Sequence, residues 1–122
     1  MDIINRDDCA AFETKDGSTI REIMAYRNSG CEQVSLAEAT VHPGEETIPH
    51  YHGCSEEIYY FLSGSGEMSV GGEHEMVGSG DAVYIPPETE HWVANSGVED
   101  LVFLCICCPP YEHEDTTPTE RE

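Results

Sequence analysis

Two short stretches of the chain carry three histidines and a carboxylate that could bind one metal ion. His50 and His52 stand two positions apart in the first stretch, and Glu57 follows five residues after His52. Residues two apart on a β-strand point to the same face of a sheet, so both imidazoles are expected to project the same way. His91 lies in the second stretch and would complete the set. Imidazole and carboxylate donors suit first-row transition metals, and an open position would leave room for chemistry.

These candidate ligands fall within a pattern that predicts an all-β fold. Eleven glycines and seven prolines divide the 122 residues into short runs, with no long stretch of helical period. Strands are expected at 18–26, 34–41, 50–52, 58–62, 67–70, 73–77, 82–85, 91–94 and 101–107. Eight or more short strands separated by turns suit a double-sheet jelly-roll barrel, which limits exposed sheet edges.

The length predicts one domain with a real hydrophobic core. We expect a polar N-terminal lead-in at 1–17, a single barrel at 18–110 and an acidic C-terminal tail at 111–122. The tail contains few apolar residues, so it is expected to be loosely ordered or laid over a neighbouring subunit. A competing interpretation is that Tyr111 folds back as a lid over the pocket mouth.

The two stretches resemble the sequence motifs of the cupin family. The first motif, G-x₅-H-x-H-x₃₋₄-E-x₆-G, is matched at every fixed position by residues 44–64. The second motif, G-x₅-P-x-G-x₂-H-x₃-N, is matched by Gly80, Pro86, His91 and Asn95. One position departs, because Glu88 stands where the family usually has glycine, and this puts the tight turn before His91 in doubt. The resemblance covers the motif region and its flanking strands, about 18–110.

The resemblance implies a double-stranded β-helix that binds one divalent transition metal, of the set Fe, Mn, Ni, Co, Cu or Zn. The implied ligands are His50, His52, Glu57 and His91. Glu56 and Glu57 are adjacent and point to opposite faces, so only one of them can bind. The family spacing favours Glu57, and it favours Glu57 over Cys54 as well.

Residues that share a strand face with Glu57 are the candidate pocket walls. Tyr59 and Phe61 alternate with Glu57, so their side chains should point inward. The residues between them should face outward, towards a second layer or a partner subunit; they are Ile58, Tyr60 and Leu62.

The last strong strand, 101–107, is expected to supply another pocket wall through Phe103 and Cys105. Cys105 and Cys107 share a face, so either both line the pocket or neither does. The alternative is that these cysteines behave as small buried hydrophobes. Glu57 and Tyr59 are the candidates for proton transfer during catalysis.

Charge excludes several classes of partner. Twenty-five acidic residues face five basic ones, for a formal net charge of −20. Binding to nucleic acid or to an anionic membrane surface is therefore not expected. No run of eighteen apolar residues predicts a membrane span, and no secretory pattern is present, so a cytoplasmic location is expected. The acidity fits either a well-solvated surface or adaptation to high internal salt.

Together these features predict a metal-dependent enzyme that acts on a small polar molecule with oxygenase- or isomerase-like chemistry. The alternative is a non-catalytic binding module for a small, sugar-like molecule, with a structural metal. The expected partners are the small molecule and a second copy of the chain in a homodimer. A metal face open to an apolar-walled cavity would favour catalysis, whereas a site closed by further side chains would favour a structural role.

Overall fold

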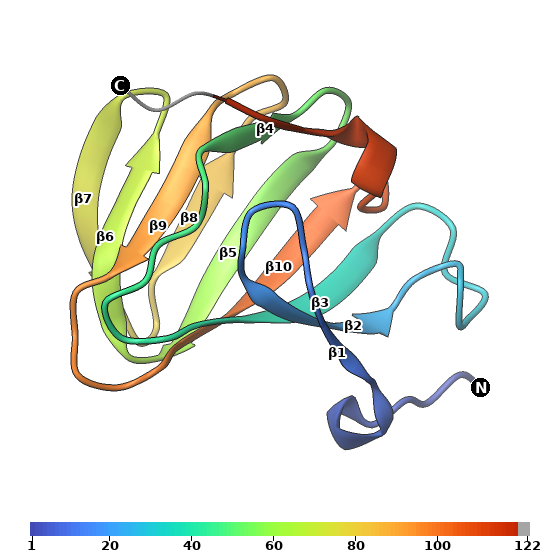
Figure 1. Cartoon of the computed structure of the whole chain (residues 1–122). Helices are drawn as coiled ribbons and strands as arrows, with labels where there is room; N and C mark the ends of the chain where they lie inside the picture. The colour runs from blue at the N-terminus through green and yellow to red at the C-terminus, as the bar shows by residue number, and fades with distance from the viewer. Residues whose placement is uncertain (120–122) are drawn as a thin grey trace.

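The computed structural model describes residues 1–119 and contains two antiparallel β-sheets that face each other (Figure 1). The six-stranded sheet has the order β1 (Ala11–Glu13), β2 (Thr19–Met24), β3 (Ser35–Val41), β10 (Leu101–Cys108), β5 (Glu56–Ser63) and β8 (Ala82–Ile85). The five-stranded sheet has the order β11 (Thr116–Pro118), β4 (His50–His52), β9 (His91–Asn95), β6 (Ser65–Val70) and β7 (Glu73–Gly78). Two single-turn 3₁₀ helices complete the described elements, η1 (Arg6–Asp8) and η2 (His113–Asp115).

This arrangement confirms the predicted all-β jelly roll. The β6–β7 hairpin forms as expected, because Gly71 and Gly72 have φ angles of 57° and 87°. Positive φ at both central residues is what a two-residue hairpin turn of this kind requires. No helix within residues 1–119 has the length and apolarity needed to cross a membrane.

Two strands were not anticipated, one near each end of the described chain. β1 pairs with β2, and all three of its residues are exposed, so it carries no alternating apolar signal. β11 pairs with β4, and Figure 1 shows this red segment beside that strand. The part of the tail at 116–118 is therefore hydrogen-bonded into the sheet and not loosely ordered, because it completes the edge beside β4. Residues 120–122 of the predicted tail lie outside the described residues.

The apolar core lies between the two sheets. Along β5 the burial alternates, so that Tyr59 and Phe61 are 3% and 0% exposed while Ile58 and Leu62 are 42% and 41% exposed. The inward and outward sets predicted for this strand thus lie on the expected faces. The buried cluster also draws on neighbouring strands through Ala39, Val41, Met68, Val77, Ile85, Val93, Leu101, Phe103 and Cys105.

A homodimer that uses the outer face of the six-stranded sheet stays a prediction. Ile58 lies opposite Tyr84 of β8, and both side chains are exposed. A two-fold interface would remove this apolar surface from water. We expect light scattering to show a dimer at micromolar concentration and Ile58→Glu to shift it towards monomer. The control Val98→Glu, at a loop residue that is 93% exposed, should leave the dimer intact. A wild-type protein that is monomeric at both low and high salt would contradict the prediction.

Candidate metal centre

Three imidazoles meet where β4 and β9 pair. His50 and His91 are direct register partners in the two antiparallel strands. Their ring centroids are 4.3 Å apart, and His52 lies 5.3 Å from each of them. One ring nitrogen from each of the three histidines lies within 4.8 Å of the others, and all three residues are buried. The topology therefore brings together ligands that are separated by about forty residues in the sequence.

Each imidazole is oriented by a hydrogen bond on the side away from this cluster. His50 Nδ1 lies 2.7 Å from the carbonyl oxygen of Ile48, and His91 Nδ1 lies 3.0 Å from that of Thr89. A carbonyl oxygen can only accept, so these two Nδ1 atoms carry the protons. In the neutral rings the Nε2 atoms are then left with free lone pairs. This arrangement, with the ring fixed from outside, is typical of histidines that bind metals.

His52 receives its orienting contact from the end of the chain. Its Nδ1 lies 3.1 Å from Thr116 Oγ1, and this hydroxyl donates its own proton to the carbonyl oxygen of Glu112. The hydroxyl oxygen is thus left to accept the Nδ1 proton of His52. β11 therefore has a second role besides completing the sheet, because it fixes one of the three imidazoles.

Glu57 directs its carboxylate at the same point from β5. Its Oε1 lies 3.2 Å from His52 Nε2 and 3.4 Å from His91 Nε2, and the side chain is 4% exposed. Burial raises the pKa of Glu57, but the interactions with His52 and His91 outweigh it, so the pKa lies below its usual range. Burial likewise lowers the pKa of His52, and the contact with Glu57 more than reverses that effect. Glu56 is exposed, as the choice between the two glutamates required.

The donor set fits a bound cation. Glu57 Oε1 and His91 Nε2 are buried and make no hydrogen bond within residues 1–119. Leaving such groups unpaired in a protein interior is costly, and a carboxylate there needs a positive partner. Ligands bonded to one metal at about 2.1 Å and 90–120° lie about 3.0–3.6 Å apart, a range that includes both Glu57 contacts. His50, His52, His91 and Glu57 could therefore hold a divalent transition metal.

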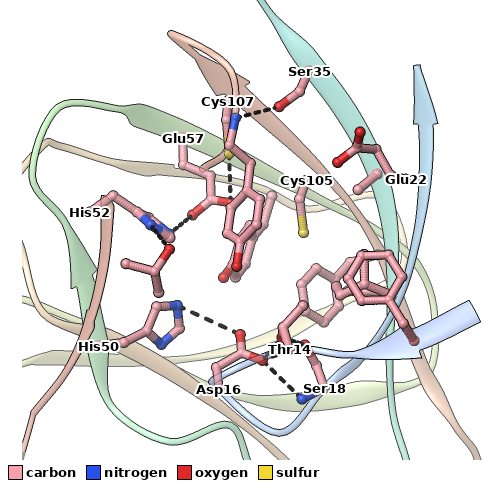
Figure 2. Close-up of a pocket in the computed structure, with 18 residues that line it drawn as sticks. Thr14, Asp16, Ser18, Glu22, Ser35, His50, His52, Glu57, Cys105 and Cys107 are labelled. Carbon is pink, nitrogen blue, oxygen red and sulfur yellow. Dashed lines mark hydrogen bonds and ion pairs between the residues drawn. The ribbon is translucent and has the colours of Figure 1, made fainter. Parts of the chain in front are cut away.

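Three of the four candidate ligands, His50, His52 and Glu57, line a cavity between the sheets, shown in Figure 2. The cavity is partly open to solvent. Among the predicted pocket walls, Tyr59, Phe103 and Cys105 line this cavity. Tyr59 packs edge-on against His91, with ring centroids 5.9 Å apart, and Phe103 stacks on Tyr59 at 4.6 Å.

Phe61 does not line this cavity, contrary to the prediction. It is fully buried and packs against Phe103 and Tyr59 at centroid distances of 5.0 and 6.3 Å. It shares the inward face with Glu57, but four residues along a strand correspond to about 13 Å. Strand alternation predicts the face of the sheet, and it does not tell how far along the barrel the cavity extends.

Cys107 supplies a contact that the sequence analysis left open. Both Cys105 and Cys107 line the cavity, and the Cys107 thiol donates a hydrogen bond to Glu57 Oε2 at 3.1 Å. Burial and the nearby Glu57 charge raise the pKa of Cys107, so the thiol stays protonated and remains a donor. The contact holds Oε2, which leaves Oε1 directed at the imidazoles.

Several chemically capable residues lie away from the centre. His42, His74 and His113 are exposed, as expected for histidines outside the two motifs. Cys54 is also exposed, and its backbone amide donates to the carboxylate of Asp115. The Cys54 thiol is therefore not part of the candidate metal centre.

Two residues of the site, Asp16 and Thr116, escaped the sequence analysis because no local pattern marks them. Asp16, in the turn between β1 and β2, has its Oδ2 atom 3.6 Å from His50 Nε2. Tyr111 lines the cavity and packs edge-on against His52 at 5.9 Å. The lid interpretation had singled out Tyr111, whereas nothing had pointed to Asp16 or Thr116.

The structure identifies what the departure at Glu88 does to the motif. Glu88 has a φ of 59°, so it adopts the left-handed conformation that the family's glycine would take. Its amide donates to the carbonyl oxygen of His52 at 2.7 Å, which ties the turn before His91 to β4. The turn is thus retained with a side chain that strains it.

Comparison with known proteins agrees with the geometry. The model of the cupin domain family matches residues 37–107, more than half of the chain. The chain belongs to the cupin family. The uncharacterised protein MJ1618 of Methanocaldococcus jannaschii is 48% identical over 105 residues, which cover 86% of this cupin and 84% of that protein.

Two further relatives have functional names. The polyketide cyclase RemF of Streptomyces resistomycificus has a similar structure, with a TM-score of 0.80 and 26% identity, covering 100% of this cupin and 87% of RemF. A glucose-6-phosphate isomerase of Thermococcus kodakarensis is 31% identical over 106 residues. That match covers 75% of this cupin and 56% of the isomerase.

Loss of any one ligand should reduce metal binding. We expect the wild type to bind one divalent ion per chain and His50→Ala, His91→Ala and Glu57→Ala to lose most of it, because each removes a donor from a buried set. Elemental analysis of purified protein after incubation with metal measures this. His74→Ala is the control, since this histidine is exposed and should leave the metal content unchanged. Full metal retention in all three ligand variants would contradict the prediction.

Removal of the Thr116 hydroxyl should weaken metal binding without removing a ligand. Thr116→Val keeps the shape of the side chain but leaves His52 Nδ1 without its acceptor. We expect metal affinity to fall roughly tenfold, as is typical when an outer partner of a metal-binding histidine is lost. Isothermal titration with the metal provides the measurement. Thr117→Val changes an exposed residue of the same strand and should bind as the wild type does; equal affinity of both variants would argue against the orienting role.

Glu88→Gly should stabilise the protein. Glycine adopts positive φ without the steric cost that a side chain incurs, so the free energy of unfolding should rise by about 1 kcal/mol. Chemical denaturation of the metal-free protein measures the change. Glu88→Ala keeps the strain and should bring no comparable gain. If alanine stabilises as much as glycine does, the cause is loss of the side chain's charge and not relief of the backbone.

Proposed function

We propose that this cupin is a metal-dependent enzyme that acts on a small molecule through a carbonyl or hydroxyl oxygen bound at the metal, by isomerase-like chemistry. The observation that supports this most is the position of the free donors. Glu57, His50 and His52 line a cavity that is partly open to solvent, and His91 Nε2 lies 3.4 Å from Glu57 Oε1. A centre with a purely structural role would be expected to be closed by protein ligands.

The cavity walls suit a compact organic substrate. One side is formed by apolar and aromatic residues from five adjacent strands of the six-stranded sheet: Phe12, Ile20, Ala37, Ala39, Tyr59 and Phe103. Concave sites that are mainly apolar, with a few convergent polar groups, are typical small-molecule sites. The apolar side would hold the body of the substrate, and the polar side would fix its oxygen atoms.

A bound divalent metal would supply a Lewis acid that polarises a substrate oxygen. The residues around it would supply orientation and proton transfer. Burial, and then the charge of Glu57, raises the pKa of Tyr59 well above its ordinary value, so the phenol stays protonated. Tyr59 is therefore suited to donate a hydrogen bond or a proton to a substrate oxygen, and not to act as a base. Cys107 would keep Glu57 from rotating away during this step.

The functional names of relatives support the isomerase-like alternative over an oxygenase. RemF is named a polyketide cyclase, and the Thermococcus protein is named a glucose-6-phosphate isomerase. A cyclase closes a ring and an isomerase rearranges one molecule, so neither name describes a reaction with O₂. The match covers 56% of the isomerase, so its name guides only the type of chemistry proposed and not the substrate.

Hydrogen exchange next to a carbonyl group tests the proposal. We expect protein loaded with Mn²⁺, Fe²⁺, Co²⁺ or Ni²⁺ to exchange carbon-bound hydrogens of acetoin or dihydroxyacetone in D₂O, followed by NMR, and the metal-free protein not to do so. Tyr59→Phe should retain the metal but exchange at least about tenfold more slowly, because the proton donor is lost. Metal-dependent consumption of O₂ would instead favour an oxygenase, and binding without exchange would favour the binding-module alternative.

A further inference from the structure

Asp16 places a second carboxylate beside the metal centre. Its Oδ1 atom is held within its own turn, where it accepts from the Ser18 amide at 2.9 Å and from the hydroxyls of Ser18 and Thr14. The backbone carbonyl of Asp16 accepts from the amide of Ile48 at 2.7 Å, which fastens the turn to the segment that leads into β4. The position of Asp16 is therefore fixed from two sides, and only Oδ2 is left to face the cavity (Figure 2).

The free oxygen of Asp16 faces another acceptor. Asp16 Oδ2 lies 3.6 Å from His50 Nε2, whose ring already donates through Nδ1 to the Ile48 carbonyl. Two lone pairs that face each other at this distance repel unless a cation or a hydrogen-bond donor lies near both. The metal would bind the lone pair of His50 Nε2, and a hydrogen-bond donor on a bound molecule would pair with Asp16 Oδ2.

No basic side chain offsets this carboxylate. Within residues 1–119, neither lysine nor arginine lines the cavity. Glu22 also lines it, but that carboxylate is paired with Arg27 at 3.1 Å. Lys15, although adjacent to Asp16 in sequence, directs its ammonium group to the carbonyl oxygens of His113 and Thr116. Asp16 and Glu57 together would thus neutralise one divalent cation and leave no net positive charge to attract an anion.

We propose that Asp16 determines the class of ligand: the cavity takes neutral or cationic molecules that donate a hydrogen bond from a hydroxyl or amino group, and it rejects phosphorylated and carboxylated ones. The inference rests on the proposed function, since it concerns the molecule bound at the same metal. If it holds, this cupin differs from its isomerase relative, whose name includes a phosphorylated sugar. The net charge of −20 on the chain acts in the same direction, because it disfavours the approach of anions.

Three chelating probes of one shape test the inference. Protein loaded with Co²⁺ would be titrated with 3,4-dihydroxybenzamide, 3,4-dihydroxybenzoate and 3,4-dihydroxybenzylamine, which are neutral, anionic and cationic, and binding would be followed by calorimetry and by the cobalt absorption. We expect the amide and the amine to bind at least about tenfold more tightly than the benzoate, the size of effect produced by one partly screened charge at close range. Equal binding of amide and benzoate would overturn the inference and leave the proposed function standing, whereas binding of none would contradict both.

Asp16→Asn assigns the selectivity to this residue. The amide oxygen of asparagine can still accept from Ser18 and Thr14, so the turn is retained while the charge is removed. We expect the variant to keep its cobalt and to bind amide and benzoate within about threefold of each other. Glu75→Gln, which removes one exposed charge from β7, should keep the wild-type preference. Loss of cobalt from Asp16→Asn would overturn the inference, because Asp16 would then be a metal ligand; an unchanged preference in that variant would overturn it too.

Discussion

Hydrogen-bond acceptors that face one another across a buried space are the constraint on which this structure depends. The Nε2 atoms of His50 and His91 and the Oε1 atom of Glu57 converge, and each ring has given its Nδ1 proton to an acceptor outside the cluster. Without a cation between them these atoms repel one another, and burial removes the water that would otherwise screen them. The packing of two sheets must therefore hold an electrostatically unfavourable arrangement, and a divalent ion would turn the same arrangement into a favourable one.

The outer hydrogen bonds show how the chain supports this arrangement. For His50 and His91 the acceptor is a backbone carbonyl two residues earlier, so the orientation comes from the local path of the chain into β4 and β9. For His52 the acceptor is the hydroxyl of Thr116, more than sixty residues away. Two of the three rings are thus fixed by local structure, and the third depends on the last described strand.

The contrast between locally fixed and remotely fixed residues explains what could be predicted from the sequence. The spacing of His50, His52 and Glu57 encodes a local geometry, since strand alternation fixes which side chains share a face. The jelly roll followed from the same regularity, together with the turn residues between the strands. Asp16 and Thr116 have no such signal, because Asp16 lies in the turn after edge strand β1 and Thr116 in edge strand β11, and the few residues of these strands show no apolar alternation. Their contribution arises from the register of β1 with β2 and of β11 with β4, which only the folded chain reveals.

The metal centre and the residues that would select the bound molecule come from different parts of the chain. The family match covers residues 37–107, and all four candidate metal ligands lie inside it. Asp16, Tyr111 and Thr116 lie outside it, in segments that pack onto the barrel from the two ends of the chain. Proteins of this family can therefore share the centre while the terminal segments alter the charge and shape of the cavity around it. In this cupin the N-terminal turn brings a carboxylate and no compensating base, so the selectivity of the site follows from a part of the chain that family membership leaves unspecified.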